Sequence, residues 1–355
     1  MKIFYAVQAT GNGHISRAVE LVPLLQKYGE VDVFLSGSNY SLKSNLPVAY
    51  RSKGLSLVYN NEVGSIDIQK TIKNISLRKI WSEAKFLPLE KYDLVINDFE
   101  SITSLACRLK KVKSIHLGHQ ASFLSKKVPR PAKTDFLGEW VLRNYAGGTE
   151  NYGFHFREYD DNIFNPIIKT SILQAEPSNK GHITIYLGQY DSSVIIEAIK
   201  EIKDFKFEIF CRKAKDVIVN QNYKILPISQ ELFTQSLLSC NGIITGAGFE
   251  TPAEALYLNK KLMVIPLKGQ YEQLCNAEAL KDFNVAVVNN LGENFKHSFQ
   301  EWIEQSGQKS LILNKTAVEI IEEVVEGKPQ SKLANIRANH WKSPFELPQQ
   351  QIASQ

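Results

Sequence analysis

The chain has 355 residues and a formal net charge of +5, and 43% of its residues are hydrophobic. This composition is typical of globular proteins and excludes collagen-like, coiled-coil and largely disordered chains. The longest apolar stretches, such as 3–7 and 262–267, are far shorter than the ~18 residues that cross a bilayer, so we expect no membrane span. No secretory signal follows Met1 and the cysteines have neither disulfide nor zinc-ligand spacing, so we expect a cytoplasmic protein.

Short β-rich segments alternate with longer helical patterns along the chain, which is typical of parallel α/β proteins. In chain order, the predicted strands of the first half are 2–8, 31–36, 93–97 and 114–118, with helices over 15–28 and 101–110. The predicted strands of the second half are 182–187, 207–211, 242–245 and 262–266. We therefore predict an α/β fold with two Rossmann-like, doubly wound parallel sheets facing each other across a cleft. Such sheets bind ligands at the carboxyl ends of their strands.

The length of the chain favours two domains. A polar stretch that contains Pro and Asn, near residues 162–181, separates the two series of predicted strands. We place the boundary there and predict an N-terminal domain at 1–165, a C-terminal domain at 166–327 and a polar, partly disordered tail at 328–355.

A glycine-rich loop, Gly11-Asn12-Gly13, joins the first predicted strand to a helix that carries His14 and Arg17. Glycines let a backbone approach a ligand closely, and the helix N-terminus offers free N–H groups to an anion. The loop lacks the Lys-Ser/Thr ending of a P-loop and the third glycine of a dinucleotide fingerprint. His14 is either a hydrogen bonder at the start of the helix or a general base, since an imidazole titrates near pH ~6.5.

Two further catalytic candidates, Asp98 and His119, end the predicted strands at 93–97 and 114–118. Because the carboxyl ends of parallel strands meet at one edge of a sheet, we expect both side chains near His14. The alternatives are that Asp98 caps the helix that begins near residue 101 and that His119 is an ordinary polar residue near the surface.

A second glycine motif, Gly246-Ala247-Gly248-Phe249-Glu250-Thr251, leads from a buried strand into a helix. Its amides and the helix N-terminus suit a diphosphate, and Glu254, one turn inside, can accept hydrogen bonds from two ribose hydroxyls. Thr251 and Glu254 also have the spacing of a capping box, which requires no function. Glu250 places a carboxylate beside the expected diphosphate, where it fits only if it faces the sugar or is protonated. Further donor-side candidates are Gly188, Gln270, Glu272 and Gln273.

The segment 246–254, followed by Pro266 and 270–276, resembles the donor-binding half of GT-B glycosyltransferases, particularly the MurG-like and UDP-glucuronosyltransferase-like branches. The loop at 11–14 is similar to their acceptor-side loop. The resemblance implies a UDP-sugar donor in the second domain, with its diphosphate at 246–251, its ribose at Glu254 and its sugar at Glu272 and Gln273. It implies an acceptor hydroxyl, on a lipid-linked or glycan molecule, bound mainly by the first domain.

On this basis we expect an inverting glycosyltransferase in which His14 takes the proton of the acceptor hydroxyl as UDP leaves. The chain has no Asp-x-Asp sequence, so we expect neither a metal ion nor another cofactor. Two alternatives remain open: a UDP-sugar 2-epimerase-type isomerase and a non-catalytic nucleotide-sugar binding protein. Against the isomerase, the glycine turn is followed by Glu-Thr-Pro-Ala-Glu rather than by the Gln-Glu-Glu of those enzymes.

Residues 101–145 carry a local excess of Lys and Arg. Within 122–133 these residues alternate with apolar ones, namely Phe123, Leu124, Lys126, Lys127, Arg130 and, at its end, Lys133. The segment is either a solvated loop or a patch that rests on anionic lipid at the inner face of a membrane. Nucleic acid is not an expected partner, because no aromatic stacking platform accompanies the charge.

Overall fold

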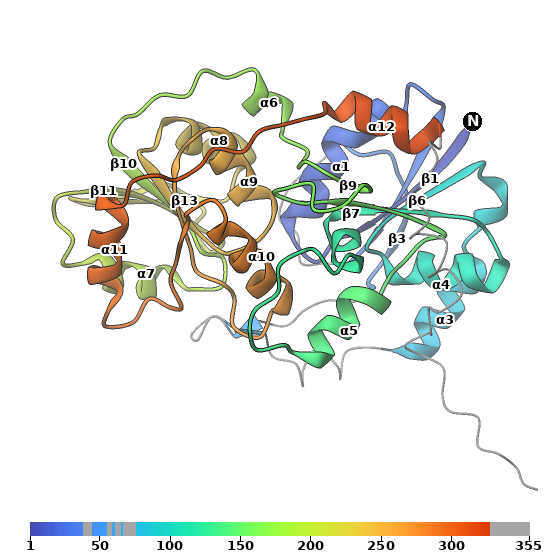
Figure 1. The fold of residues 1–355 in the computed structure, drawn as a ribbon, viewed down its shortest axis with the longest axis horizontal. Coiled ribbons are helices and arrows are strands. Elements are labelled where there is room, and N and C mark those ends of the chain that lie inside the picture. Colours follow the sequence, from blue (N-terminus) through green and yellow to red (C-terminus); the bar gives the residue numbers. More distant parts are fainter. Residues whose placement is uncertain (38–44, 55–58, 61–64, 67–75, 327–355) are drawn as a thin grey trace, which may run out of the picture.

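The computed structural model describes residues 1–37, 45–54, 59–60, 65–66 and 76–326, and the predicted tail at 328–355 lies outside the described residues. Figure 1 shows two lobes side by side, each built on one sheet with flanking helices. Six of the seven strands in the second sheet and all seven in the first run parallel to a neighbour. The predicted α/β fold with two doubly wound parallel sheets is confirmed.

The first sheet has the strand order β3-β2-β1-β6-β7-β8-β9. Its strands are β1 (Lys2–Gln8), β2 (Glu30–Ser36), β3 (Val48–Ser52), β6 (Leu94–Asp98), β7 (Ile115–Gly118), β8 (Glu150–Phe154) and β9 (Ile163–Phe164). A separate antiparallel pair is formed by β4 (Tyr59–Asn60) and β5 (Ser65–Ile66). The helices of this part are α1 (Asn12–Leu25), α3 (Leu77–Phe86), η1 (Leu89–Lys91), α4 (Ser101–Lys110), η2 (His119–Leu124) and α5 (Phe136–Asn144).

The second sheet has the strand order β12-β13-β11-β10-β14-β15-β16, with β12 antiparallel at one edge. Its strands are β10 (His182–Tyr186), β11 (Lys206–Cys211), β12 (Ile218–Val219), β13 (Tyr223–Pro227), β14 (Gly242–Thr245), β15 (Lys261–Val264) and β16 (Ala286–Val287). The remaining helices are α6 (Thr170–Leu173), α7 (Ser192–Ile199), α8 (Gln230–Ser239), α9 (Glu250–Tyr257), α10 (Tyr271–Lys281), α11 (Phe295–Glu304) and α12 (Ala317–Glu326).

The strand order explains where a ligand site forms. β1 lies between β2 and β6, and it is buried over all but its first residue, as a central parallel strand must be. The chain order of the strands reverses beside β1, and beside β10 in the second sheet. In doubly wound sheets a crevice opens at the carboxyl end of the strands at such a switch point. The loops that follow β1 and β10 are therefore placed to line a site.

The last described helix returns to the first lobe. α12 contacts α1, and Figure 1 shows the chain crossing back over the molecule to reach it. The predicted division, which places 166–327 in one domain, is therefore wrong for this helix. The physical reason is that Ile320, Ile321 and Val324 form a buried apolar face that packs in the core containing Leu21 of α1. Among the described residues, no helix is both long and apolar enough to cross a membrane.

Candidate active site

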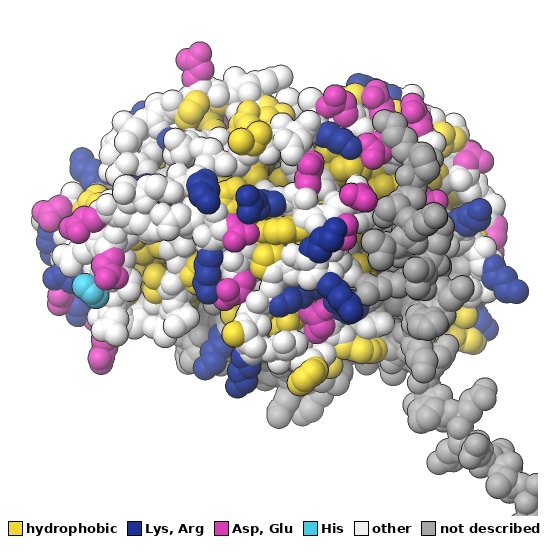
Figure 2. Space-filling view, viewed as in Figure 1, with side chains coloured by type: hydrophobic (Ala, Val, Ile, Leu, Met, Phe, Trp, Pro, Cys, Tyr) yellow, Lys and Arg dark blue, Asp and Glu magenta, His cyan; other side chains and the backbone are white. Residues whose placement is uncertain are grey.

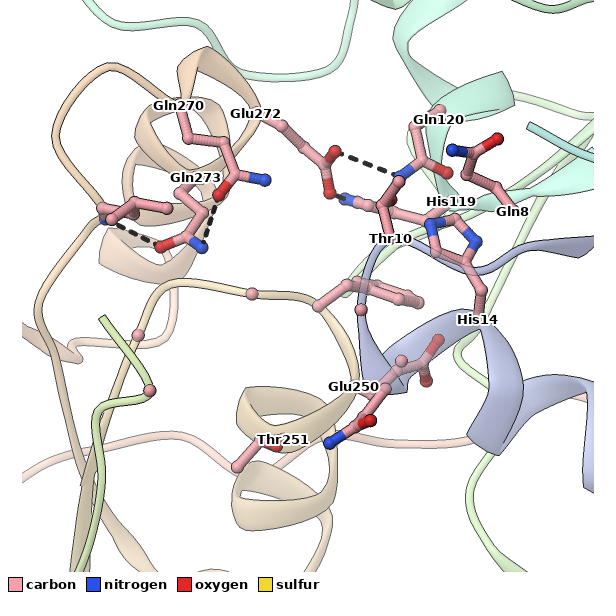
Figure 3. Close-up of a pocket in the computed structure, with 18 of the residues that line it drawn as sticks. Gln8, Thr10, His14, His119, Gln120, Glu250, Thr251, Gln270, Glu272 and Gln273 are labelled. Atoms are coloured by element: carbon pink, nitrogen blue, oxygen red, sulfur yellow. Dashed lines mark hydrogen bonds and ion pairs between the residues drawn. The ribbon is translucent and has the colours of Figure 1, made fainter. Parts of the chain in front are cut away.

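A cavity of about 950 Å³ lies between the two lobes. Figure 3 shows side chains from both lobes pointing into it. Of the residues predicted from the sequence, those that line it are Gly11, Asn12, Gly13, His14, Arg17, His119, Gly188, Gly246, Gly248, Phe249, Glu250, Thr251, Gln270, Glu272 and Gln273. Asp98, Ala247 and Glu254 lie behind its wall.

His14 and Asp98 form a pair at the first-lobe side of the cavity. His14 Nδ1 lies 2.9 Å from Oδ1 of Asp98, which is fully buried at the end of β6. With Nδ1 facing the carboxylate, Nε2 is the ring nitrogen left for a ligand. The capping role considered for Asp98 belongs instead to Glu100, whose carboxylate accepts hydrogen bonds from the backbone of α4.

Arg17 connects this pair to the second lobe. Its guanidinium donates to Asp98 Oδ1 and Oδ2 from Nη2 at 2.8 Å, and its Nη1 donates to Glu250 Oε1. Burial alone would raise the pKa of Asp98, but the positive charge of Arg17, with His14, holds it well below its usual range. The sequence identified Arg17 only as a loop-side residue, because its two carboxylate partners are distant in the chain.

The side chain of Glu250 points toward the first lobe, where it contacts Arg17. Burial raises the pKa of Glu250 to about 7. The positive charge of Arg17 lowers this pKa, whereas the negative charges of Glu254 and Asp98 raise it further. Gly13 packs close to Glu250, since a Cβ at Gly13 would lie 3.2 Å from Glu250 Cγ and would require that side chain to shift by a few tenths of an ångström. The structure thus gives the Glu250 carboxylate a cationic partner, Arg17, next to the segment that is expected to bind a diphosphate.

His119 is a contact between the lobes rather than a free base. Its Nδ1 lies 2.8 Å from the carbonyl oxygen of Phe154, and its Nε2 lies 2.8 Å from Oδ1 of Asn276 in α10. The orientation of the Asn276 amide is set by a 3.1 Å hydrogen bond from its Nδ2 to the carbonyl oxygen of Ala247. The ring also stacks on Phe249, with centroids 4.0 Å apart. Both ring nitrogens are therefore occupied.

The predicted capping box in the donor motif is wrong. α9 begins at Glu250, after Phe249 as N-cap without a side-chain cap, so Thr251 and Glu254 are already inside the helix. Glu254 is instead paired with Lys169, whose Nζ donates to its Oε1 at 2.9 Å. Burial raises the pKa of Glu254, and Lys169 opposes that rise. Lys169 itself lines the cavity, and no sequence pattern pointed to it because it lies in the segment between the sheets.

The polar residues at the start of α10 are held in place by neighbours. Gln273 Oε1 accepts from the backbone N–H of Leu267 at 2.8 Å, and its Nε2 donates to Gln270 at 2.9 Å. Glu272 accepts from Gln120 Nε2 of the first lobe at 3.0 Å, as Figure 3 shows. Gln120 was missed in the sequence although it directly follows His119 at a strand end. Gln8 and Thr10, also missed, line the cavity beside the first glycine loop.

The predicted lipid patch at 122–133 is only partly exposed. Phe123 is fully buried, and Arg130 lies over its ring while donating to Glu139 at 2.8 Å. Lys127 is paired with Asp160 at 2.9 Å. The apolar and basic groups of this segment therefore stabilise the loop itself, which corrects the interpretation of 122–133 as one continuous surface patch.

Exposed apolar side chains lie instead on α5, at the lower edge of the molecule in Figure 2. Phe136 and Leu137 are 86% and 61% exposed, and Trp140 is 40% exposed. Leu137 and Trp140 also line the cavity, together with Ile80 of α3. The first-lobe part of the cavity therefore has an apolar wall that continues onto the surface.

The comparisons with known proteins agree with this architecture. A family model for glycosyl transferase family 1 matches residues 1–304. No curated protein sequence matches the chain. The solved structure of spinosyn forosaminyltransferase SpnP is 13% identical, with 97% of this chain and 96% of that chain covered and a TM-score of 0.56.

Two further solved structures show the same fold. MurG of Acinetobacter baumannii is 15% identical, with 90% of this chain and 94% of that chain covered and a TM-score of 0.51. UGT89C1 of Arabidopsis thaliana, complexed with UDP, is 10% identical, with 92% and 98% covered and a TM-score of 0.53. The resemblance to GT-B enzymes is thus confirmed. Since the family model covers most of the chain, the protein belongs to glycosyl transferase family 1 and is a glycosyltransferase with a GT-B fold.

Proposed function

We propose that this glycosyltransferase inverts the anomeric configuration and transfers a sugar from a UDP-sugar to an acceptor hydroxyl without a metal ion. The observation that carries the proposal is the position of His14. It faces the cavity from the first lobe with Nδ1 held 2.9 Å from Asp98, and the glycine loop of the second lobe lines the same cavity. An imidazole held in this way suits a general base for a hydroxyl placed between the lobes.

The proposed donor site is the loop at 246–251 and the N-terminus of α9. Free backbone N–H groups and the helix dipole would stabilise the charge that develops on the leaving UDP. This fixed positive potential, together with the lack of an Asp-x-Asp sequence, supports metal independence. Glu272 and Gln273 are proposed to bind the sugar hydroxyls, and Glu254 the ribose.

In the proposed reaction, His14 Nε2 accepts the proton of the acceptor hydroxyl. The hydroxyl oxygen forms a bond to the anomeric carbon while the bond from that carbon to the UDP oxygen breaks. Attack from the face opposite the leaving group inverts the configuration of the sugar. Asp98 stabilises the imidazolium that forms, as carboxylates do in comparable His–Asp pairs.

We propose an acceptor with an apolar part, such as a lipid-linked glycan, used by a cytoplasmic enzyme bound peripherally at the inner face of a membrane. The support is the apolar wall formed by Ile80, Leu137 and Trp140. Phe86 at the end of α3 is 83% exposed and Phe136 at the start of α5 is 86% exposed. Side chains of this kind can insert into the interfacial region of a bilayer.

Product analysis tests the proposal. A thermal-shift panel of nucleotides identifies a stabilising donor, and the protein is then incubated with UDP-sugars and candidate acceptors in EDTA. We expect free UDP and a glycoside whose anomeric configuration, determined by NMR, is inverted. A retained configuration or a requirement for added metal contradicts those parts of the proposal. Formation of an epimer identifies the isomerase alternative, and binding without turnover identifies the non-catalytic one.

A further inference from the structure

Arg17 joins the two lobes directly at the cavity. It lies one helical turn after His14 on α1, and its side chain is only 2% exposed. Nε and Nη2 donate to the two oxygens of Asp98, and Nη2 also lies 3.1 Å from His14 Nδ1. Nη1 donates to Glu250 in the donor loop of the other lobe. One buried cation therefore contacts the proposed base, the carboxylate behind that base and a carboxylate from the donor loop.

Arg17 and His14 compete for the same carboxylate. Asp98 Oδ1 lies 2.9 Å from His14 Nδ1 and accepts from Arg17 Nη2 at 2.8 Å. A carboxylate whose charge is balanced by a guanidinium stabilises an imidazolium less, and Arg17 repels a protonated His14 at this distance. By itself, Arg17 would therefore weaken His14 as a base.

Glu250 supplies the opposing charge. When ionised, its carboxylate engages the Nη1 end of Arg17, so that two carboxylates share one guanidinium and one negative charge remains to face His14. Burial raises the pKa of Glu250 to about 7, so this charge is lost as the pH falls through that range. Arg17, His14 and Asp98 all belong to the first lobe, whereas Glu250 is the first residue of α9 in the second. The compensating charge is thus supplied by the donor-binding loop.

The other ionisable groups around this cluster are neutral or already paired. Burial lowers the pKa of His116 on β7 to about 4, and burial and Asp98 raise the pKa of Tyr5 on β1 well above its ordinary value. Glu254 on α9 is paired with Lys169, and both ring nitrogens of His119 are occupied. Arg17, Asp98 and Glu250 therefore dominate the charge that His14 experiences.

We propose that Glu250 is a positioning residue that acts through Arg17 to keep Asp98 available to His14, so that the strength of the base depends on the donor loop. The proposal rests on the proposed function, in which His14 is the general base. It gives Arg17 and Glu250 opposite effects on one measurable quantity, the titration midpoint of His14. A purely structural role would not produce opposite shifts.

The test is an NMR titration of the full-length protein labelled with ¹⁵N-histidine, which requires no identified substrate. The sequence contains seven histidines, and the His14 signal is assigned by its loss in His14→Gln. Glu250→Gln should lower the His14 midpoint, and Arg17→Gln should raise it. Glu250→Asp keeps the charge and should remain closer to the wild-type midpoint.

The matched control is Glu197→Gln on α7, which neutralises a side chain that is 70% exposed and should leave the midpoint unchanged. Circular dichroism and thermal melting establish that each variant is folded. If Glu250→Gln does not fold, the shift in Arg17→Gln decides. Midpoints that move in the same direction in both variants, or that do not move in folded protein, overturn the proposal.

A kinetic measurement separates this proposal from the proposed function. The rate of UDP release from a UDP-sugar in the presence of an acceptor is followed against pH in the same variants, and its acidic limb should follow the His14 midpoint. Opposite midpoint shifts without any UDP release would support the coupling and contradict the transferase mechanism. UDP release with an acidic limb that is identical in all variants would overturn the coupling alone.

Discussion

Lys169 donates to Glu254 at 2.9 Å, and the two side chains are only 10% and 3% exposed. The carboxylate proposed to hold the ribose is therefore already occupied by an ammonium from the segment between the sheets. Lys169 lines the cavity, whereas Glu254 lies behind it. A bound ribose must displace Lys169 from Glu254 or share the carboxylate with it, so donor binding and this ion pair are coupled.

Glu254→Ala should weaken UDP binding by about 1 to 3 kcal/mol if the carboxylate holds the ribose. It should also lower the free energy of unfolding by about 3 to 5 kcal/mol, because Lys169 is left as an unpaired buried charge. Calorimetry and denaturant unfolding measure the two effects. The double variant Lys169→Met, Glu254→Ala should recover part of the stability and none of the affinity. Wild-type UDP affinity in that folded double variant would exclude the ribose role.

His14→Ala should reduce turnover by ~10²- to 10⁴-fold, the usual contribution of a general base, while UDP affinity stays nearly constant. The wild-type rate should fall as the pH drops through the imidazole range, because a protonated ring cannot accept the hydroxyl proton. Steady-state kinetics and calorimetry provide the measurements. A variant that keeps more than about a third of wild-type turnover would rule out His14 as the base.

Glu250→Gln should change how stability depends on pH. Burial raises the pKa of Glu250 in the folded protein to about 7 from its ordinary value of 4.5, so its contribution to stability is greatest below pH ~4.5 and is lost as the pH rises through ~7. This loss amounts to about 3 kcal/mol in the wild type. Denaturant unfolding at a series of pH values should show that the free energy of unfolding declines less with rising pH in Glu250→Gln than in the wild type. Parallel curves for the two proteins would show that Glu250 does not titrate in this range.

Replacing Phe86 and Phe136 by Ser should reduce sedimentation with anionic liposomes, because both are exposed and neither lines the cavity. UDP binding should not change. The control is Ile312→Ser, which removes another side chain that is 77% exposed. High salt should weaken any contribution from nearby Lys and Arg. If the wild-type protein does not sediment with such liposomes at low salt, the proposed membrane contact is contradicted.

Gly138→Ala should disturb the contact between α5 and α10. A Cβ at Gly138 would lie 2.4 Å from Cβ of Tyr271, a backbone-proximal atom that cannot turn away. We expect the free energy of unfolding to fall by about 1 to 3 kcal/mol. Gly248→Ala is the control for stability, because an added Cβ there meets nothing within 4 Å. Equal melting temperatures for the two variants would show that α5 and α10 accommodate the added Cβ without loss of stability.

The sequence was sufficient for the fold and for much of the cavity wall. Alternating strand and helix patterns place a loop at the end of each central strand, and parallel topology brings those loops to one edge. Local composition therefore located His14, Asp98 and the segment 246–251 before any contact was known. The closeness of His14 and Asp98 followed from the same topology, although they are far apart in the chain.

The sequence could not show which side chains pair across the cavity. Glu250 seemed out of place because its partner Arg17 belongs to the other lobe, and Glu254 resembled a cap because Lys169 is distant in the chain. His119 had the position of a catalytic residue, and only the three-dimensional contacts show that both ring nitrogens are occupied. Long-range pairing depends on how two sheets dock, which local spacing does not encode.

The return of α12 to α1 means that the first lobe is not a continuous piece of the chain. The polypeptide crosses between the lobes twice, once within 165–181 and again between α11 and α12. A proteolytic cut between α11 and α12 would leave the two sheets covalently joined, whereas a cut within 165–181 would leave the first sheet held through non-covalent contacts, among them the packing of α12 on α1. A fragment that ends at residue 165 would also expose the apolar side of α1 that α12 covers. Neither lobe can therefore be obtained alone simply by dividing the gene in two.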